Sequence, residues 1–411
     1  VCVFLYGGND HGNTLPPYDT ASHTAYSSIR GSLATPRASL AATALTPAVP
    51  LPGGRQMALA PELAPLKPLF DSGQLGVLLN VGTLIQPTTL AQYTARSVPL
   101  PPKLFSHNDQ QSVWQSSLPE GATSGWGGRL GDLFMAGNGN ATFTCVNASG
   151  NAVYMSGREA VQYQVSPTGS VALRGIGAPL FGSQACSDAL RALVTAGDRA
   201  HLMQAEHTRV MRRAIDANVA LTAALAAAPA LTTTFDSANP LALQLQMVAR
   251  MIGARNALQA RRQVFFVSIG GFDLHDFLLA QHPGLLTNVA GALKSFHDAM
   301  LELGVAQQVT TFTGSDFGRT LTSNGDGSDH GWGSHHFILG AAVRGQRFHG
   351  TLPAMSVNGT DDVGQGRLLP TLAVDQLAAT LATWMGVSAS NLPMVAPNIG
   401  NYTVKDLGLF I

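Results

Sequence analysis

Short runs rich in hydrophobic residues recur along the chain, and most of them end at glycine. The clearest are Val1–Tyr6, Leu75–Val81 and Gln263–Ile269. An apolar run of this length is typical of a strand that is covered on both faces. Two further runs, Gln308–Thr313 and Phe337–Val343, complete the set of predicted strands.

Helical patterns alternate with these runs. The spacing predicts helices over residues 107–117, with Ser106 as the N-cap, and over Gly127–Met135, His282–Leu303 and Pro370–Trp384. Buried strands that alternate with helices favour a mostly parallel sheet between two helical layers. We therefore expect an α/β fold, a three-layer α/β/α sandwich.

Two long helical stretches, Ser187–Ala228 and Asn239–Arg261, interrupt this alternation. We expect them to form a helical insertion, residues 181–262, packed beside the sheet. The chain has 411 residues, of which 45% are hydrophobic, so it can bury one large core. Residues 1–411 are therefore expected to form a single domain.

The charge composition narrows the possible partners. Only 12% of residues are charged, and Lys+Arg and Asp+Glu both number 24, so no basic field exists to hold nucleic acid. The apolar stretch Leu221–Leu231 is too short for a transmembrane segment and contains a proline. Because Val1–Tyr6 already resembles a core strand, we expect an export signal upstream of residue 1 and a periplasmic or secreted location.

The three cysteines leave two possibilities open. Cys2 lies in the first predicted strand and is expected to be a buried thiol. Cys145 and Cys186 flank a stretch rich in Gly and Ser. They form either one disulfide, in agreement with export, or two unrelated thiols.

Acidic and histidine residues follow the predicted strands. In a parallel sheet the carboxyl ends of the strands meet at one edge, where ligands bind. Singly, each residue is better explained as a turn, cap or surface residue. Together they predict a site for one or two divalent cations, with zinc as the first choice and manganese, iron or calcium as alternatives. The expected ligands are Asp10, Asp273, His275, Asp329, His330 and His335.

Several longer motifs carry a resemblance to a known family. They are LYGGNDHGNTLPPYD, LFSHNDQQSVWQS, SGWGGRLGDL, GGFDLHD, FTGSDFGRTLTSNGDGSDHGWGSHHFILG and GRLLPTLAVDQLAATLATWMGV. The chain resembles a bacterial exported family, domain of unknown function 1501, which is grouped with the alkaline-phosphatase and sulfatase superfamily. The resemblance covers the chain from its first residue to its last predicted helix, and it implies an alkaline-phosphatase-like fold.

The resemblance also implies roles for the acidic and histidine residues. Asp329-His330-Gly331 is similar to the superfamily's DHG motif, which supplies two ligands to one metal. Asp273 and His275 resemble the pair that binds the other metal, although only one residue separates them here. A later histidine joins that pair; we expect His335 rather than His336. Asp10 corresponds to the superfamily's first-strand Asp.

Superfamily hydrolases place a nucleophile at a helix N-terminus, where the helix dipole favours an anion. Ser106 is the candidate nucleophile, and an ordinary N-cap is its alternative role. His107 is a candidate ligand or general acid. The signature of Cys or Ser before x-P-x-R is absent, which argues against a formylglycine sulfatase. Asn13 is a candidate for orienting a substrate, and Arg319 for pairing with its anionic group.

Two functions from different classes follow. The first is an exported metal-dependent hydrolase of phosphate or sulfate esters or a related anionic substrate, small or polymeric. The second is a non-catalytic protein of the cell envelope that keeps the fold and serves a protein partner structurally or in assembly. The completeness of the ligand set and the turnover of an ester discriminate between them.

Overall fold

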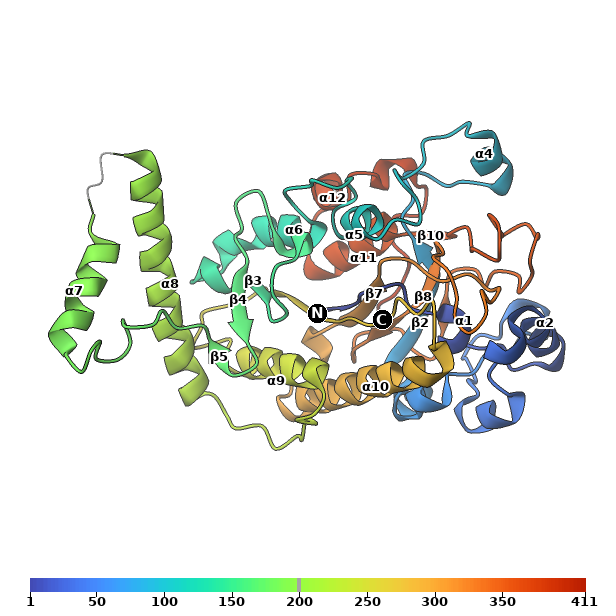
Figure 1. Ribbon diagram of the computed structural model, residues 1–411, viewed down its shortest axis with the longest axis horizontal. Coiled ribbons are helices and arrows are strands. Elements are labelled where there is room, and N and C mark those ends of the chain that lie inside the picture. Colours follow the sequence, from blue (N-terminus) through green and yellow to red (C-terminus); the bar gives the residue numbers. More distant parts are fainter. Residues whose placement is uncertain (198–200) are drawn as a thin grey trace.

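A ten-stranded mixed sheet forms the centre of the computed structural model, which describes residues 1–197 and 201–411 (Figure 1). The expectation of an α/β fold is confirmed. From one edge to the other, the strands are β10 (Leu372–Ala373), β2 (Leu75–Gly82), β8 (Ser334–Leu339), β7 (Thr311–Ser315), β1 (Cys2–Leu5), β6 (Val264–Ile269), β3 (Cys145–Asn147), β4 (Tyr163–Ser166) and β5 (Gly169–Ser170), while β9 (Phe348–His349) pairs with β2.

The sheet is mostly parallel. Strand β1 lies between β6 and β7 and is parallel to both. Strand β8 runs antiparallel to its neighbours β2 and β7. As a consequence, the start of β8 lies at the edge where β1, β2, β6 and β7 end, which we call the carboxyl edge.

Strand β8 begins three residues before the predicted run Phe337–Val343. Ser334, His335 and His336 belong to it and are buried. The hydrophobic pattern missed them because two imidazoles occupy positions inside the sheet.

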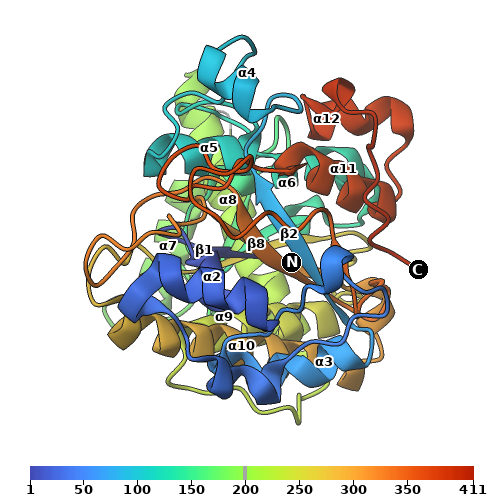
Figure 2. The same ribbon diagram turned by 90° about the vertical axis from the view of Figure 1, so that its right-hand side faces the viewer.

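Alternating side chains of β1 reach two different cores, which explains its unbroken apolar sequence. Val3 and Leu5 join the core formed with α9 (Pro240–Gly253) and α10 (Leu278–Glu302). Cys2 and Phe4 join the core on the other face, with α5 (His107–Ser116), α6 (Trp126–Phe134) and α11 (Val374–Met385). Figures 1 and 2 show these helices on opposite sides of the sheet, so the three-layer arrangement is confirmed.

The remaining helices complete these layers and the loops around them. Their bounds are α1 (His11–Thr14), α2 (Thr20–Arg30), α3 (Lys67–Asp71), α4 (Leu90–Ala95), α5 (His107–Ser116), α6 (Trp126–Phe134), α7 (Gln184–Thr195), α8 (Leu202–Ala227), α11 (Val374–Met385) and α12 (Leu392–Val395).

The expected insertion, residues 181–262, divides into two parts. Helices α7 and α8 project from the body as an arm (Figure 1), whereas α9 packs against β6 and α10 in the core. The predicted helix Ser187–Ala228 includes residues 198–200, which lie outside the described residues. On either side of them, α7 ends at Thr195 and α8 begins at Leu202.

A disulfide between Cys145 and Cys186 is not formed. Cys145 is buried in β3, whereas Cys186 is exposed on α7 of the arm, and all three cysteines are free thiols. The alternative of unrelated thiols therefore holds. Among the described helices, none combines the length and the apolar character that crossing a bilayer requires.

Candidate metal centre

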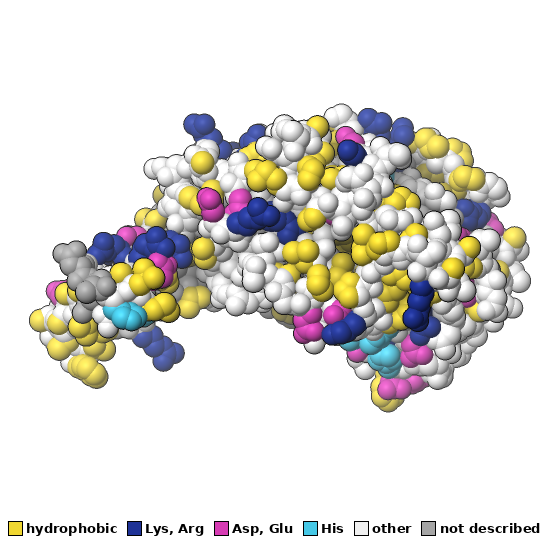
Figure 3. Space-filling model, turned by 90° about the horizontal axis from the view of Figure 1, so that it is seen from above, with side chains coloured by type: hydrophobic (Ala, Val, Ile, Leu, Met, Phe, Trp, Pro, Cys, Tyr) yellow, Lys and Arg dark blue, Asp and Glu magenta, His cyan; other side chains and the backbone are white. Residues whose placement is uncertain are grey.

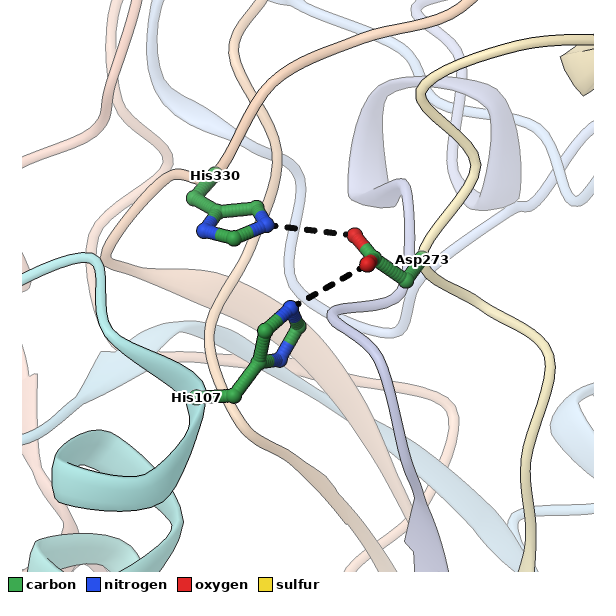
Figure 4. A group of neighbouring side chains, drawn as sticks. All are labelled: His107, Asp273 and His330. Atoms are coloured by element: carbon green, nitrogen blue, oxygen red, sulfur yellow. Dashed lines mark hydrogen bonds and ion pairs between the residues drawn. The ribbon is translucent and has the colours of Figure 1, made fainter.

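Three side chains from distant parts of the chain meet at the carboxyl edge (Figure 4). His107 is the first residue of α5, Asp273 lies in the loop after β6, and His330 lies in the loop before β8. One ligand atom from each lies within 4.8 Å of the others. Nε2 of His330 is 3.2 Å from Oδ1 of Asp273, and Nε2 of His107 is 3.3 Å from Oδ2.

His275 adjoins this group. Its Nε2 lies 3.1 Å from Oδ1 of Asp273 and 2.9 Å from Nε2 of His330. The group is open to solvent, because the side chains of Asp273 and His275 are 43% and 40% exposed. Figure 3 shows histidine and acidic side chains gathered at the surface of the body away from the arm.

The other nitrogen of each histidine contacts an oxygen that only accepts. Nδ1 of His330 donates to the backbone carbonyl of Phe105 at 2.7 Å. Nδ1 of His107 donates to Oδ2 of Asp316 at 2.6 Å. The contact of Nδ1 is the shorter one in both rings, so we assign the proton of each neutral ring to Nδ1. In that form Nε2 keeps its lone pair, which faces Asp273.

His275 repeats this arrangement. Its Nδ1 lies 3.0 Å from Oδ1 of Asp329, which also accepts from the side chain of Asn324 at 2.9 Å. Nε2 of His275 and Nε2 of His330 then face each other as two lone pairs at 2.9 Å. Two acceptors cannot bond to each other, so this contact requires a shared cation or an additional proton.

The charges favour the forms that bind metal. Partial burial opposes ionisation of Asp273, yet the hydrogen bond and charge of Arg319 hold the pKa of that carboxyl below its usual value. Burial lowers the pKa of His330, which keeps its ring neutral. The hydrogen bond to Asp316 raises the pKa of His107. Protons therefore compete with a metal ion more strongly at His107 than at His330.

Arg319 is not free to meet a substrate, contrary to the sequence-based prediction. Its side chain is fully buried and donates to Oδ1 of Asp273 at 2.6 Å and to the carbonyl of Gly7 at 3.2 Å. It also donates to the carbonyl of Ser328. Arg319 therefore holds the carboxylate of Asp273 from the buried side. Asn13 is likewise engaged inside the protein, where Tyr26 donates to its side-chain oxygen.

Asp10 lies near these loops but outside the group. Its carboxylate pairs with Arg30 at 2.6 Å, and both side chains are almost completely buried. It also accepts from Ser328 and caps α1. Burial opposes its ionisation, yet the charges of Arg30 and two nearby histidines, together with the hydrogen bond of Arg30, lower its pKa. The structure thus gives Asp10 a buried partner where the sequence predicted a metal.

His335 is not placed as a ligand either. Nδ1 of His335 accepts the backbone N–H of Asn80 at 3.0 Å, so the neutral ring carries its proton on Nε2. Neither nitrogen then offers a free lone pair. His336, the other option, is buried beside Thr313. His11, whose ring lies 5.3 Å from that of His335, has no partner for either nitrogen among the described residues.

Ser106 takes the N-cap position of α5, as predicted from the sequence. Its hydroxyl donates to Oδ2 of Asp109 at 2.9 Å, and it caps no backbone N–H group. It directly precedes His107. The residue before it, Phe105, has a positive φ of 72° and presents its carbonyl to His330. The unusual backbone of Phe105 thus directs its carbonyl to His330, two residues before His107 begins α5.

Two residues of the site, Asp316 and Gln111, were not predicted from the sequence as functional residues. Asp316 follows β7 directly, just as Asp273 follows β6 closely, and this position was the available signal. Gln111 lies one turn after His107 on α5 and donates to Asp316 at 2.7 Å. Nothing in the pattern of α5 distinguishes Gln111 from other polar positions of a helix.

A separate pocket lies at the opposite edge of the sheet. It encloses about 340 Å³ and is lined by Trp126, Arg255, Arg262, Trp384 and others. No histidine or carboxylate lines it, so it offers none of the usual ligands for a zinc-like ion. Among the described residues, the group of three or more side chains that could hold a metal ion lies at the carboxyl edge.

Comparisons with known proteins identify the family. A comparison with curated proteins finds no match. A sulfatase structure described with the metabolism of multiple glycosaminoglycans by Bacteroides thetaiotaomicron is similar at a TM-score of 0.37 and 10% identity, over 95% of this chain and 73% of that one. The family profile described as "Protein of unknown function (DUF1501)" matches residues 1–395. The chain therefore belongs to the DUF1501 family.

Proposed function

We propose that this protein is a metal-dependent hydrolase of phosphate or sulfate esters, with one divalent cation at the candidate metal centre. The observation that carries the proposal is the shared orientation of three histidines. His107, His275 and His330 each direct Nε2 toward Asp273 while an oxygen holds Nδ1. Metal-binding histidines in proteins have this arrangement.

The residues present fit a zinc-like ion. Imidazole nitrogens and a carboxylate are its usual ligands, and a catalytic site keeps one position open for water or substrate. His107, Asp273 and His330 would hold the ion, and His275 would complete the set. When bound, such an ion polarises an ester oxygen and lowers the pKa of water. Manganese, iron or calcium remain alternatives to zinc.

Arg367 supports an anionic substrate. Its Nε donates to the carbonyl of His330 at 2.7 Å, and its guanidinium lies 4.9 Å from the ring centroid of Phe105. Within the described part of the chain, no carboxylate pairs with it. A half-buried arginine beside the centre can therefore pair with a phosphate or sulfate oxygen.

The proposed nucleophile is either water or Ser106. Ser106 already donates its proton toward a carboxylate, that of Asp109, and it lies at the N-terminus of α5, where backbone N–H groups favour an anion. His107, held by Asp316, is available to protonate the leaving group if it does not bind the metal. Export to the periplasm or medium belongs to this proposal and is supported by the family resemblance.

The proposal is tested by turnover of an aryl phosphate and an aryl sulfate by metal-free protein before and after addition of zinc or manganese. We expect activity only with metal, and a loss of at least about 100-fold in His330→Ala. His207→Ala, an exposed histidine on the arm, is the matched control and is expected to retain activity. Metal bound at the centre without turnover of either ester contradicts hydrolysis and favours the structural alternative.

A further inference from the structure

Asp316 is a completely buried carboxylate directly behind His107. Its side chain has no exposure to solvent. Oδ2 accepts from Nδ1 of His107 at 2.6 Å, from the side chain of Gln111 at 2.7 Å and from the backbone N–H of Gly7 at 3.2 Å. Three donors therefore converge on one oxygen.

These donors come from two different elements of the fold, helix α5 and the turn after β1. His107 and Gln111 lie one turn apart on the same face of α5. Gly7 follows β1 and has a φ of 113°, which a residue with a Cβ rarely adopts. Asp316 itself directly follows β7. The carboxylate thus joins the start of α5 to the ends of two central strands.

The ring of His107 is also held by packing. Phe317 lies next to Asp316 in the chain, and its ring centroid is 4.8 Å from that of His107 and 4.7 Å from that of His330. Gly8 makes room for this ring, since a Cβ there would lie 2.5 Å from it. The residues after β7 therefore act on His107 in two ways. Phe317 packs against its ring, and Asp316 bonds its Nδ1.

We propose that Asp316 is a positioning residue that holds His107 with its proton on Nδ1 and its Nε2 lone pair turned toward Asp273 and His330. The part of this proposal that concerns a cation rests on the proposed function. The part that concerns the tautomer does not. A carboxylate that only accepts leaves His107 no other neutral form with the same hydrogen bond.

The rival role for Asp316 is direct ligation. Oδ1 has no partner among the described residues, so it is a candidate ligand atom. Geometry favours the positioning role, because the group of atoms within 4.8 Å consists of His107, Asp273 and His330. The two roles differ in what the loss of the carboxylate does to His107.

The experiment combines two readouts on the full chain. Two-bond nitrogen–proton correlation spectra of metal-free protein at pH 8 report which nitrogen of His107 carries the proton, with His107→Asn identifying its signals. Zinc affinity is measured by competition with a chelator. Asp316→Asn is compared with Asp326→Asn, an exposed acid that bonds the backbone of Phe277.

We expect the wild type to show the proton on Nδ1, and Asp316→Asn to show a mixture of tautomers with zinc affinity about 10–100-fold weaker. Asp326→Asn is expected to match the wild type. A proton on Nε2 in the wild type, alone or together with one on Nδ1, overturns the proposal, and this readout does not depend on the folding of Asp316→Asn. Loss of zinc binding with an unchanged tautomer in Asp316→Asn also overturns it, in favour of direct ligation. If the wild type binds no zinc, the zinc form of the proposed function fails, while the spectra still show which nitrogen of His107 carries the proton.

Discussion

The position of one proton on each imidazole decides what the candidate centre can do. His107, His275 and His330 each have Nδ1 engaged by an oxygen, and this leaves Nε2 for a cation. His335 has the reverse arrangement, because its Nδ1 accepts a backbone N–H. Identical residue types at the same edge of the sheet thus differ in which nitrogen is engaged, and a single hydrogen bond makes the difference.

Asp10 provides a prediction at this scale. Asp10→Asn removes the charge that neutralises buried Arg30, so we expect a loss of about 3–5 kcal/mol in the free energy of unfolding. Zinc affinity is expected to remain at the wild-type value, since Asp10 lies outside the group of ligand atoms. Chemical denaturation and chelator competition measure the two quantities. A variant of normal stability that has lost zinc would instead make Asp10 a ligand.

At the scale of elements, the centre depends on short turns at the ends of β1, β6 and β7. Gly7 follows β1 closely, and a Cβ on it would lie 2.3 Å from the backbone nitrogen of Asp273. The loop after β6 can therefore approach β1 only if position 7 is glycine. The strand ends bring Asp273 and Asp316 together, while α5 supplies His107 from a third direction.

Gly7→Ala tests this dependence. The substitution forces Asp273 away from His107 and His330, so we expect weaker zinc binding as well as lower stability. Gly150→Ala is the matched control, because Gly150 has a similar φ of 108° but open space around its Cβ position. Both variants carry a backbone penalty of about 1–2 kcal/mol. Equal zinc affinity in the two variants would contradict the close-approach argument.

At the scale of the whole molecule, buried histidines couple stability to pH. Burial lowers the pKa of His11 and of His282 to about 4, and that of His336 to about 3. The unfolded chain binds protons at these residues near pH 6.5, whereas the folded protein does not. Stability is therefore full above that pH and falls as the pH decreases toward the folded pKa values.

Each such histidine contributes up to about 1.4 kcal/mol per pH unit between pH 6 and pH 4. We expect the free energy of unfolding of the metal-free protein to fall steeply in this interval. His282→Gln removes one of these histidines. We expect it to reduce the slope of the free energy of unfolding against pH by the contribution of one proton, whatever its effect on stability at pH 8. Urea denaturation at several pH values measures the slope. A free energy that is constant from pH 7 to pH 4 would contradict neutral burial of these rings.

The sequence allowed prediction of the architecture because its signals are local. Unbroken apolar runs such as Val1–Tyr6 identify strands covered on both faces, and their order with helices predicts the three layers. The direction of β8 depends on long-range pairing, which no local pattern contains. Its two buried histidines also interrupt the hydrophobic pattern that marks a strand.

The candidate centre was predictable only in part, for a related reason. Asp273 and His330 follow from their positions at strand ends. The partner of each side chain does not, because Arg30 and Arg319 reach the carboxyl edge through tertiary packing and there neutralise Asp10 and Asp273. Asp316 had the same sequence signal as Asp273, and only its burial behind His107 distinguishes their roles.

The most direct test of the central claim is the location of zinc in crystals of the protein by anomalous diffraction at the zinc absorption edge. We predict one strong peak about 2.0–2.2 Å from Nε2 of His107, Nε2 of His330 and a carboxylate oxygen of Asp273. A peak elsewhere, or no peak at saturating zinc with these three side chains ordered, would contradict the account.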